Sequence, residues 1–362
     1  MRRRWRIAAV AGGVAAVCVL ALVLRTLNAA GVFYDVTPGF AGTCRSIGGV
    51  IGGEDIAIDR AAGLAFISAT DRRAPKTKPS AQDGLYLFQL AHPERGVTRL
   101  SGSPKDFHPH GISLYRAADG SLTLMAVNHR SDGTSSVDIF AVTEGKDAAG
   151  MPAVSLGERA SVRSSLIFSP NDVAAVAPDR FYVTNDHTSR TGLGRTLEIY
   201  LLLPRANVVY YDGTVPRVVA EGLRFANGIA LSHDRSKLYV AETLGREIRT
   251  YDVQPVAGGL TLQSAFPLPS GLDNIDVDAA GNLWVAGHPK LFDFIDYAGD
   301  ASRPSPSEVF KVTTANGNPN GFTAIYTGLG TRIGGASVGA VDDGQLLIGS
   351  VFDPKILDCT LR

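Results

Sequence analysis

A pattern of polar and apolar positions recurs along most of the chain. Each copy has one or two polar residues, an aliphatic residue that opens a short strand, a turn, and a second apolar strand. The first copy is GGEDIAID, which continues through the turn RAAG into LAFIS. Successive copies are spaced by 46 to 63 residues, so this is an internal repeat. The aliphatic residues that mark the six copies are Ile56, Ile112, Val173, Ile229, Ile275 and Val338.

The repeat predicts an all-β fold. A third strand follows in most copies, as in GLYLFQL and SVDIFAV, and a fourth follows in some, as in RVVAEG. Alternating strands separated by Asp- and Gly-containing turns are typical of all-β proteins. Six units of about four strands predict a six-bladed β-propeller, whose radial repetition leaves only short edges. A β-solenoid would need shorter and more even repeats.

Two segments interrupt the strand pattern. Residues 184–207 include most of the apolar run TLEIYLLLPRANVVYY, which ends at Tyr211, and we expect this segment to be partly helical. It is either a lid or membrane-facing element, or an ordinary insertion between strands. Residues 71–84, DRRAPKTKPSAQDG, are expected to form an exposed loop.

The N-terminus has a different character. An uncharged run at about 7–24 follows four arginines and precedes only Arg25, which predicts a single membrane span with the rest of the chain outside the cytoplasm. A cleaved signal peptide is the alternative, because LNAAG at 27–31 offers small residues to a peptidase. A buried core helix is disfavoured by the flanking arginines. We therefore divide the chain into a signal anchor at 1–30 and a catalytic propeller at 31–362.

Charge and cysteine content narrow the class further. Lysine plus arginine equals aspartate plus glutamate at 35 each, which argues against a nucleic-acid partner. Cys18 lies in the apolar run, whereas Cys44 and Cys359 stand at the two ends of the exported part. An oxidising compartment would permit a disulfide between them, worth about 4–5 kcal/mol in the chain-entropy model and able to lock the ring shut. The alternative is two unrelated free thiols.

The polar residues of the repeat predict a metal site. The first strand of each propeller blade lines the central channel, and all six run the same way, so these residues meet at one end. Oxygen-rich side chains suit a hard cation such as Ca²⁺, whereas zinc would require more His or Cys. Alternatively, they cap strand ends and bind water. The set comprises Glu54, His110, Asn171, Asn227, Asp273 and Ala336, with Asp55, Asp172 and Asn274 at the next position.

Two histidines are candidates for proton transfer. His110 belongs to the channel set, and His129 ends the second strand of the same copy, so a hairpin would bring the two rings together. A histidine beside a metal-bound carbonyl could activate water. His108, His187 or His288 could act instead. A glycine-rich phosphate loop and H-E-x-x-H are absent from the sequence, whereas GASVG at 335–339 has the G-x-S-x-G spacing. It opens a strand of the repeat rather than a strand-to-helix turn, so a serine hydrolase is disfavoured.

At these residues the chain resembles the paraoxonase/arylesterase family of calcium-dependent six-bladed propeller lactonases and esterases. The resemblance covers residues 33–361 and includes GGEDIAI, HPHGIS, PNDVAAVAPDRFYVTNDH, VVAEGLRFANGIALS, DNIDVD, LWVAGHP and LLIGSVF. The N-terminal apolar run and the placement of Cys44 and Cys359 also look like the family, whose members often retain an uncleaved anchor.

The resemblance implies a function and a set of site residues. The expected activity is that of a carboxylic ester hydrolase acting on lactones and aryl esters, with Ca²⁺ polarising the carbonyl and His110 and His129 activating water. Asp273 is a possible alternative base, and Asp186 and His187 match a further family pair. A structural Ca²⁺ would use Asp55, Asp172 and the backbone carbonyl of Ile112. The catalytic Ca²⁺ would be held by Glu54, Asn171, Asn227, Asp273 and Asn274.

The chain also departs from the family. The loop after GLAFIS reads ATDRRAPK where relatives usually offer apolar or aromatic residues, Asp353 follows Phe352, and the segment 188–206 diverges. These changes affect substrate range rather than the metal site. Two other functions remain open: a gluconolactonase-like enzyme for sugar lactones, and a membrane-anchored binding propeller in which calcium serves only stability.

Overall fold

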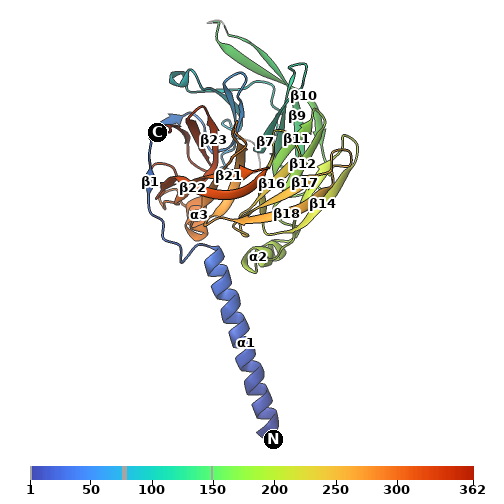
Figure 1. The fold of residues 1–362 in the computed structure, drawn as a ribbon, viewed down its shortest axis with the longest axis vertical. Coiled ribbons are helices and arrows are strands. Elements are labelled where there is room, and N and C mark those ends of the chain that lie inside the picture. The colour runs from blue at the N-terminus through green and yellow to red at the C-terminus, as the bar shows by residue number, and fades with distance from the viewer. Residues whose placement is uncertain (1, 76–79, 148–149) are drawn as a thin grey trace.

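The computed structural model describes residues 2–75, 80–147 and 150–362. Within these residues the strands form six sheets, and a long helix projects from one side of the β-structure (Figure 1). Each innermost strand contacts the innermost strands of the two neighbouring sheets, and contact between the first and last completes the circle. The predicted six-bladed β-propeller is therefore confirmed.

The innermost strands are the first strand of each repeat copy. They pair antiparallel with the second strand of the copy, and their polar residues lie at their N-terminal ends. The innermost strands are β3 (Gly53–Asp59), β7 (Pro109–Arg116), β11 (Pro170–Ala177), β15 (Ala226–Leu231), β19 (Gly271–Val277) and β23 (Ala336–Asp342).

The second strands are continuous apolar runs because each is covered on both faces by neighbouring blades. LAFISA is buried at all six positions, which explains why it lacks the alternation of a half-exposed strand. These strands are β4 (Leu64–Ala69), β8 (Leu122–His129), β12 (Arg180–Asn185), β16 (Lys237–Glu242), β20 (Leu283–His288) and β24 (Gln345–Ser350).

The third and fourth strands complete the blades, and the outermost ones carry more exposed polar residues. A short 3₁₀ helix at Pro93–Arg95 precedes β6. The third strands are β5 (Gly84–Gln89), β9 (Ser135–Lys146), β13 (Ala206–Tyr211), β17 (Glu247–Val253), β21 (Ser307–Ala315) and β25 (Lys355–Thr360). The fourth strands are β6 (Val97–Arg99), β10 (Pro152–Val162), β14 (Pro216–Leu223), β18 (Leu260–Pro267), β22 (Asn318–Gly328) and, from the N-terminal side, β2 (Thr43–Gly48).

The ring is closed by a strand from before the first blade. β2 pairs antiparallel with β25, and in this register Cys44 lies opposite Cys359. The two cysteines form a disulfide across 315 residues, which confirms the predicted bridge. A second short strand, β1 (Gly39–Phe40), pairs with β22 of the fifth blade.

Three α-helices accompany the β-structure in the described residues. α1 (Arg2–Ala29) is longer than the predicted span at 7–24 and projects away from the propeller (Figure 1). α2 (Gly192–Tyr200) lies in the segment expected to be partly helical, and α3 (Leu291–Gly299) was not predicted. The base of α1 contacts the other two, since Thr26 Oγ1 donates to the Tyr200 carbonyl at 2.8 Å and the Leu291 amide donates to the Ala30 carbonyl at 3.0 Å.

Candidate active site

The start of each innermost strand is irregular in the same way. The register between the first and second strands shifts just before or at the aliphatic marker in all six blades. Beyond the marker the pairing is regular, except for one further shift between Ala175 and Ala177 in the third blade. In the first blade the shift lies between Gly53 and Asp55, and in the fourth between Ala226 and Ile229. Residues at such bulges leave the regular ladder, which re-aims their side chains. The bulges therefore direct the side chains at the two polar positions of each repeat copy into the central channel.

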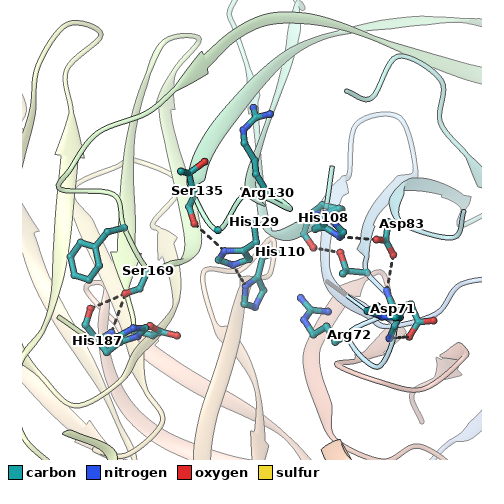
Figure 2. Close-up of a pocket in the computed structure, with 18 of the residues that line it drawn as sticks. Asp71, Arg72, Asp83, His108, His110, His129, Arg130, Ser135, Ser169 and His187 are labelled. Carbon is teal, nitrogen blue, oxygen red and sulfur yellow. Dashed lines mark hydrogen bonds and ion pairs between the residues drawn. The ribbon is translucent and has the colours of Figure 1, made fainter. Parts of the chain in front are cut away.

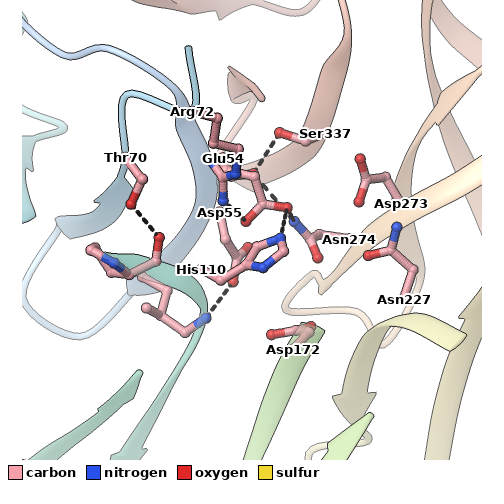
Figure 3. Close-up of polar contacts among 12 residues, drawn as sticks. Glu54, Asp55, Thr70, Arg72, His110, Asp172, Asn227, Asp273, Asn274 and Ser337 are labelled. Atoms are coloured by element: carbon pink, nitrogen blue, oxygen red, sulfur yellow. Dashed lines mark hydrogen bonds and ion pairs between the residues drawn. The ribbon is translucent and has the colours of Figure 1, made fainter. Parts of the chain in front are cut away.

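Side chains from different blades converge at this end of the channel. Figure 3 shows Glu54, Asn227, Asp273 and Asn274 around a common space, with Asp55 and Asp172 deeper along the channel. All six are at least 95 % buried. Within the described residues no group of three or more His, Cys, Asp and Glu side chains is arranged to hold a metal, so a cation here would depend largely on asparagine oxygens.

The first group, together with Asn171, fits a hard cation. Four of its buried oxygens have no hydrogen-bond partner among the described residues: Glu54 Oε2, Asn171 Oδ1, Asn227 Oδ1 and Asn274 Oδ1. An unpaired buried polar atom is costly, so a set of them in one place calls for a ligand. Carboxylate and amide oxygens are the donors that Ca²⁺ prefers.

Hydrogen bonds fix how these donors are oriented. Asn227 Nδ2 donates to Thr243 Oγ1 at 3.0 Å, and Asn274 Nδ2 donates to Glu54 Oε1 at 2.8 Å. Each amide therefore keeps its oxygen for another partner. Asp273 Oδ2 lies 2.8 Å from His288 Nε2, which leaves its other oxygen for a cation.

The deeper group is bonded differently. Asp55 accepts the backbone N–H of Ile56 and, at 2.7 Å, that of Ile112 in the next blade. Asp172 likewise accepts the amides of Val173 and Ile229. Each carboxylate oxygen keeps a lone pair, so a cation is possible, but here the carboxylates already tie adjacent blades together. Ile112 is placed beside Asp55 through its N–H.

Burial shapes the electrostatics of both groups. Desolvation first, and neighbouring carboxylates second, raise the pKa of Asp55 and of Asp172 well above the usual range. Burial likewise raises the pKa of Asp273, against the pull of His288. Burial also acts to raise the pKa of Glu54, but His110, Arg72 and Asn274 outweigh it, and the net direction is down. A divalent cation would favour the ionised form of all these carboxyl groups.

The two predicted histidines meet. His110 Nδ1 and His129 Nε2 are 2.9 Å apart, and His129 Nδ1 lies 3.2 Å from Ser135 Oγ (Figure 2). His110 Nε2 lies 3.5 Å from Glu54 Oε1, so the pair reaches the first donor group. This arrangement links a potential base to the candidate cation site.

The three histidines named as alternative bases are each held by a carboxylate. His108 Nδ1 lies 2.9 Å from Asp83 Oδ2, and His187 pairs with Asp186, the adjacent residue. His288 pairs with Asp273 and stacks on Phe294, with ring centroids 3.9 Å apart. These contacts fix the orientation of the three imidazole rings.

A cavity of about 480 Å³ opens beside the histidine pair. Its walls come from the loops at 70–75, 130–135 and 186–195, and from the segment around Phe352. Figure 2 shows Arg72, His110, His129, Ser169 and His187 around this space. A substrate in the cavity would therefore lie between the histidine pair and the charged loop after β4.

Two residues of the site, Phe294 and Arg72, were missed in the sequence. His288 was named only as an alternative base, although it ends β20 just as His129 ends β8 and so shares the position at the end of the second strand. Phe294 lies on the unpredicted helix α3. Arg72 belongs to the loop at 71–84, which was expected to be exposed. For Arg72 this expectation is wrong, since its side chain is only 17 % exposed. Residues 76–79 of that loop lie outside the described residues.

The fold and the site together define a β-propeller that gathers its reactive side chains at one mouth of its channel. The chain belongs to the arylesterase family, whose sequence model matches residues 41–361. It is 36 % identical to serum paraoxonase/arylesterase 1 of Mus musculus, over 91 % of this chain and 92 % of that protein. It is 34 % identical to serum paraoxonase/arylesterase 2 of Rattus norvegicus, over 88 % of each.

Solved structures of lower identity share the propeller. Regucalcin, a calcium-binding protein from Agrobacterium tumefaciens, superposes with a TM-score of 0.51 at 16 % identity, over 90 % of this chain and 98 % of that one. A luciferin-regenerating enzyme superposes with a TM-score of 0.53 at 15 % identity, over 88 % and 95 %. At these identities the likeness concerns the fold alone.

Proposed function

We propose that the protein is a calcium-dependent hydrolase of lactones, with aryl esters as secondary substrates. Membership of the arylesterase family supports the general class, an esterase- or lactonase-type hydrolase of small molecules. The observation that carries the calcium dependence is the set of four buried oxygens without partners, among the described residues, at the channel mouth.

The catalytic ion would be held by the first donor group, Glu54, Asn171, Asn227, Asp273 and Asn274. A second, structural ion would use Asp55, Asp172 and the carbonyl of Ile112. Bound calcium supplies Lewis acidity that polarises the substrate carbonyl. The protein supplies the rest: a fixed donor set, a cavity that orients the substrate, and a group that takes a proton from water.

That group is His110 in our proposal. If His129 Nδ1–H donates to Ser135 Oγ, then His129 Nε2 accepts from His110 Nδ1–H, and His110 Nε2 is left as the base. This nitrogen faces Glu54 and hence the cation site. Positive charge that develops on His110 during proton transfer would be shared with His129 through this hydrogen bond.

A panel of alkyl lactones, sugar lactones and aryl esters, assayed with and without a calcium chelator, tests this function. We expect chelation to abolish hydrolysis and calcium to restore it, with alkyl lactones turned over fastest. Full activity in excess chelator, in protein without bound metal by elemental analysis, would contradict the calcium dependence. Faster turnover of sugar lactones would favour the gluconolactonase-like alternative. Hydrolysis retained after Asn227→Ala or Asp273→Ala, in folded protein, would exclude a role for the donor group.

We further propose that α1 anchors the protein in a membrane with the propeller outside the cytoplasm. Its segment Val10–Ala29 is long and apolar enough to cross a bilayer, and its large apolar side chains, such as Val10 and Val17, are exposed. A signal peptide passes the same test. Protease accessibility on intact cells, together with N-terminal sequencing of the mature protein, would separate an anchored chain from a cleaved one.

A further inference from the structure

Arg72 places a positive charge inside the cavity, next to a proposed calcium ligand. It follows β4 on the loop at 70–75 and lines the same space as His110 and His129 (Figure 2). Its Nη2 lies 3.8 Å from Glu54 Oε2, and Figure 3 shows the two side chains adjacent. Any substrate carbonyl held near Glu54 would therefore bring its own substituents within reach of this guanidinium.

The guanidinium has one unpartnered nitrogen and one long ion pair. Nη1 is buried without a hydrogen-bond partner among the described residues, and 3.8 Å to Glu54 exceeds hydrogen-bond distance. The nearby carboxylate of Asp83 is occupied, since it accepts the amides of Asp71 and Ser80 and pairs with His108. A buried guanidinium nitrogen in this condition is costly unless a ligand completes it.

In the calcium-loaded enzyme, the carboxylates of the first donor group would no longer balance the charge of Arg72. On the function proposed above, Glu54 and Asp273 contribute two negative charges to a site that holds a divalent cation. Those charges cancel, so the positive charge of Arg72 remains without a counter-charge in the first donor group. An anionic group on the substrate would supply the negative charge that balances Arg72.

The neighbouring arginine is committed elsewhere. The Arg73 guanidinium lies 4.5 Å from the ring centroid of Tyr297 and 4.7 Å from that of Phe352, and it donates to the Phe352 carbonyl at 3.3 Å. Arg73 thus joins α3 to the segment after β24 at the mouth. Of these two adjacent arginines, only Arg72 is oriented to bind a ligand.

We propose that Arg72 binds a carboxylate of the substrate, so that the enzyme prefers lactones carrying a carboxylate near the scissile ester group. This specificity rests on the proposed hydrolase function and narrows it. A guanidinium forms two parallel hydrogen bonds with a carboxylate, which gives both affinity and orientation. Neutral lactones of the same shape would leave Arg72 unpaired and bind more weakly.

The first test compares a γ-lactone bearing a free carboxylate with its carboxamide analogue. For the full-chain protein loaded with calcium, we expect kcat/KM to favour the carboxylate by about ten- to hundredfold, the usual range for a charged hydrogen bond. Arg72→Met should abolish this preference, and Arg72→Lys should retain part of it. Arg195→Met is the matched control, because it removes a charge from the exposed rim of the same cavity and should leave the preference intact.

The second test measures binding without turnover. Calorimetry on the calcium-loaded protein should show glutarate binding more tightly than glutaramide, and Arg72→Met should reduce glutarate affinity about tenfold or more while Arg195→Met does not. Because glutarate can also bind the ion directly, the variants decide the role of Arg72.

The outcomes separate the two proposals. Equal kcat/KM for the carboxylate and carboxamide lactones in the wild-type protein would overturn the role of Arg72 and leave the hydrolase function standing. A carboxylate preference that survives in folded Arg72→Met would do the same. Arg72-dependent glutarate binding in a protein that hydrolyses no lactone would instead support the anion site and reject the proposed function. If Arg72→Met fails to fold, Arg72→Lys takes its place, and a carboxylate preference undiminished in folded Arg72→Lys would overturn the role of Arg72.

Discussion

At the scale of single residues, the contact between His110 and His129 has direct kinetic consequences. His110→Gln removes the proposed base but keeps a polar side chain of similar reach. We expect kcat to fall about 10²- to 10⁴-fold, the range for loss of a general base. Bound calcium, measured by elemental analysis, should be unchanged because the ring is not a proposed ligand. Ser135→Ala should cost less, since it removes only the group that orients His129. Unchanged turnover in His110→Gln would remove the histidine pair from the mechanism.

The buried aspartates make stability depend on pH in a way that calcium should reverse. Burial and neighbouring carboxylates raise the pKa of Asp55 and of Asp172, so the folded metal-free protein holds protons that the unfolded chain has released. The stability from these protons is fully present below the unfolded value of about 4 and is lost as pH rises through the raised folded values.

We therefore expect the melting temperature of chelated protein to fall between pH 5 and 8, whereas calcium-loaded protein holds its stability and the gap between the two widens. Differential scanning calorimetry across this range measures both. Asp55→Asn should flatten the slope of the chelated protein, because it removes one titrating group. A slope that the substitution leaves unchanged would mean that other buried carboxyl groups control it.

Part of the site could be predicted residue by residue, and part could not. Glu54, Asn227 and Asp273 were predictable because a fixed phase in a repeat places equivalent residues at equivalent points of a ring. Arg72 was not, because its burial depends on the path of a single loop that no other blade repeats. His288 was named only as an alternative base. Its place in the site could have been predicted, since it ends its strand at the same position as His129.

At the scale of elements, the bulged start of each innermost strand leaves little room for its neighbours. In the second blade the bulge holds Gly111, where an added Cβ would lie 2.2 Å from Asp172 Oδ1 of the next blade. Gly111→Ala should therefore cost about 1–3 kcal/mol of unfolding free energy, as overpacking does, and should weaken calcium binding by displacing Asp172. Urea denaturation measures the first effect and calorimetry the second.

A second glycine-to-alanine substitution distinguishes the effect of steric crowding on stability from the effect of replacing glycine as such. Gly145 lies in β9, and a Cβ added there would meet no other atom of the described residues within 4 Å, so Gly145→Ala should be close to neutral. If both substitutions had the same small effect, the close approach of the second and third blades would not be a constraint.

Strands were predicted better than helices for a physical reason. Alternating side chains and turns recur in every blade, so each copy supports the assignment of the others. α3 has only nine residues, LFDFIDYAG, and lies between two strong strands, so its own pattern was too short to stand out. It is held by tertiary contacts instead, through Leu291 and Tyr297, which are buried.

At the scale of the whole molecule, the disulfide holds together the ends of the propeller. Cys44→Ser should lower the free energy of unfolding by about 6 kcal/mol in the chain-entropy model, because the bridge closes a loop of 315 residues. Urea denaturation with and without a reductant measures this. Cys18→Ser is the control, since Cys18 is an exposed free cysteine in α1 and should leave the propeller unaffected. Equal stability of Cys44→Ser and wild type would show that strand pairing alone closes the ring.

The number of blades and the closing bridge could be predicted because both depend on the order and spacing of repeat copies. The attachment of β1 to the fifth blade could not, since Gly39–Phe40 has too few residues to carry a strand pattern.

This closure also sets an order of events during synthesis. β2 is made about 300 residues before β25, its partner, so at 5–20 residues per second it waits roughly 15–60 seconds. Throughout that interval the edge of β2 is unpaired and Cys44 is a free thiol. The sixth blade can form only after the ribosome has passed Thr360. The earliest strands of the propeller thus depend on the last, and a chain that stops short by a few residues is left as an open ring.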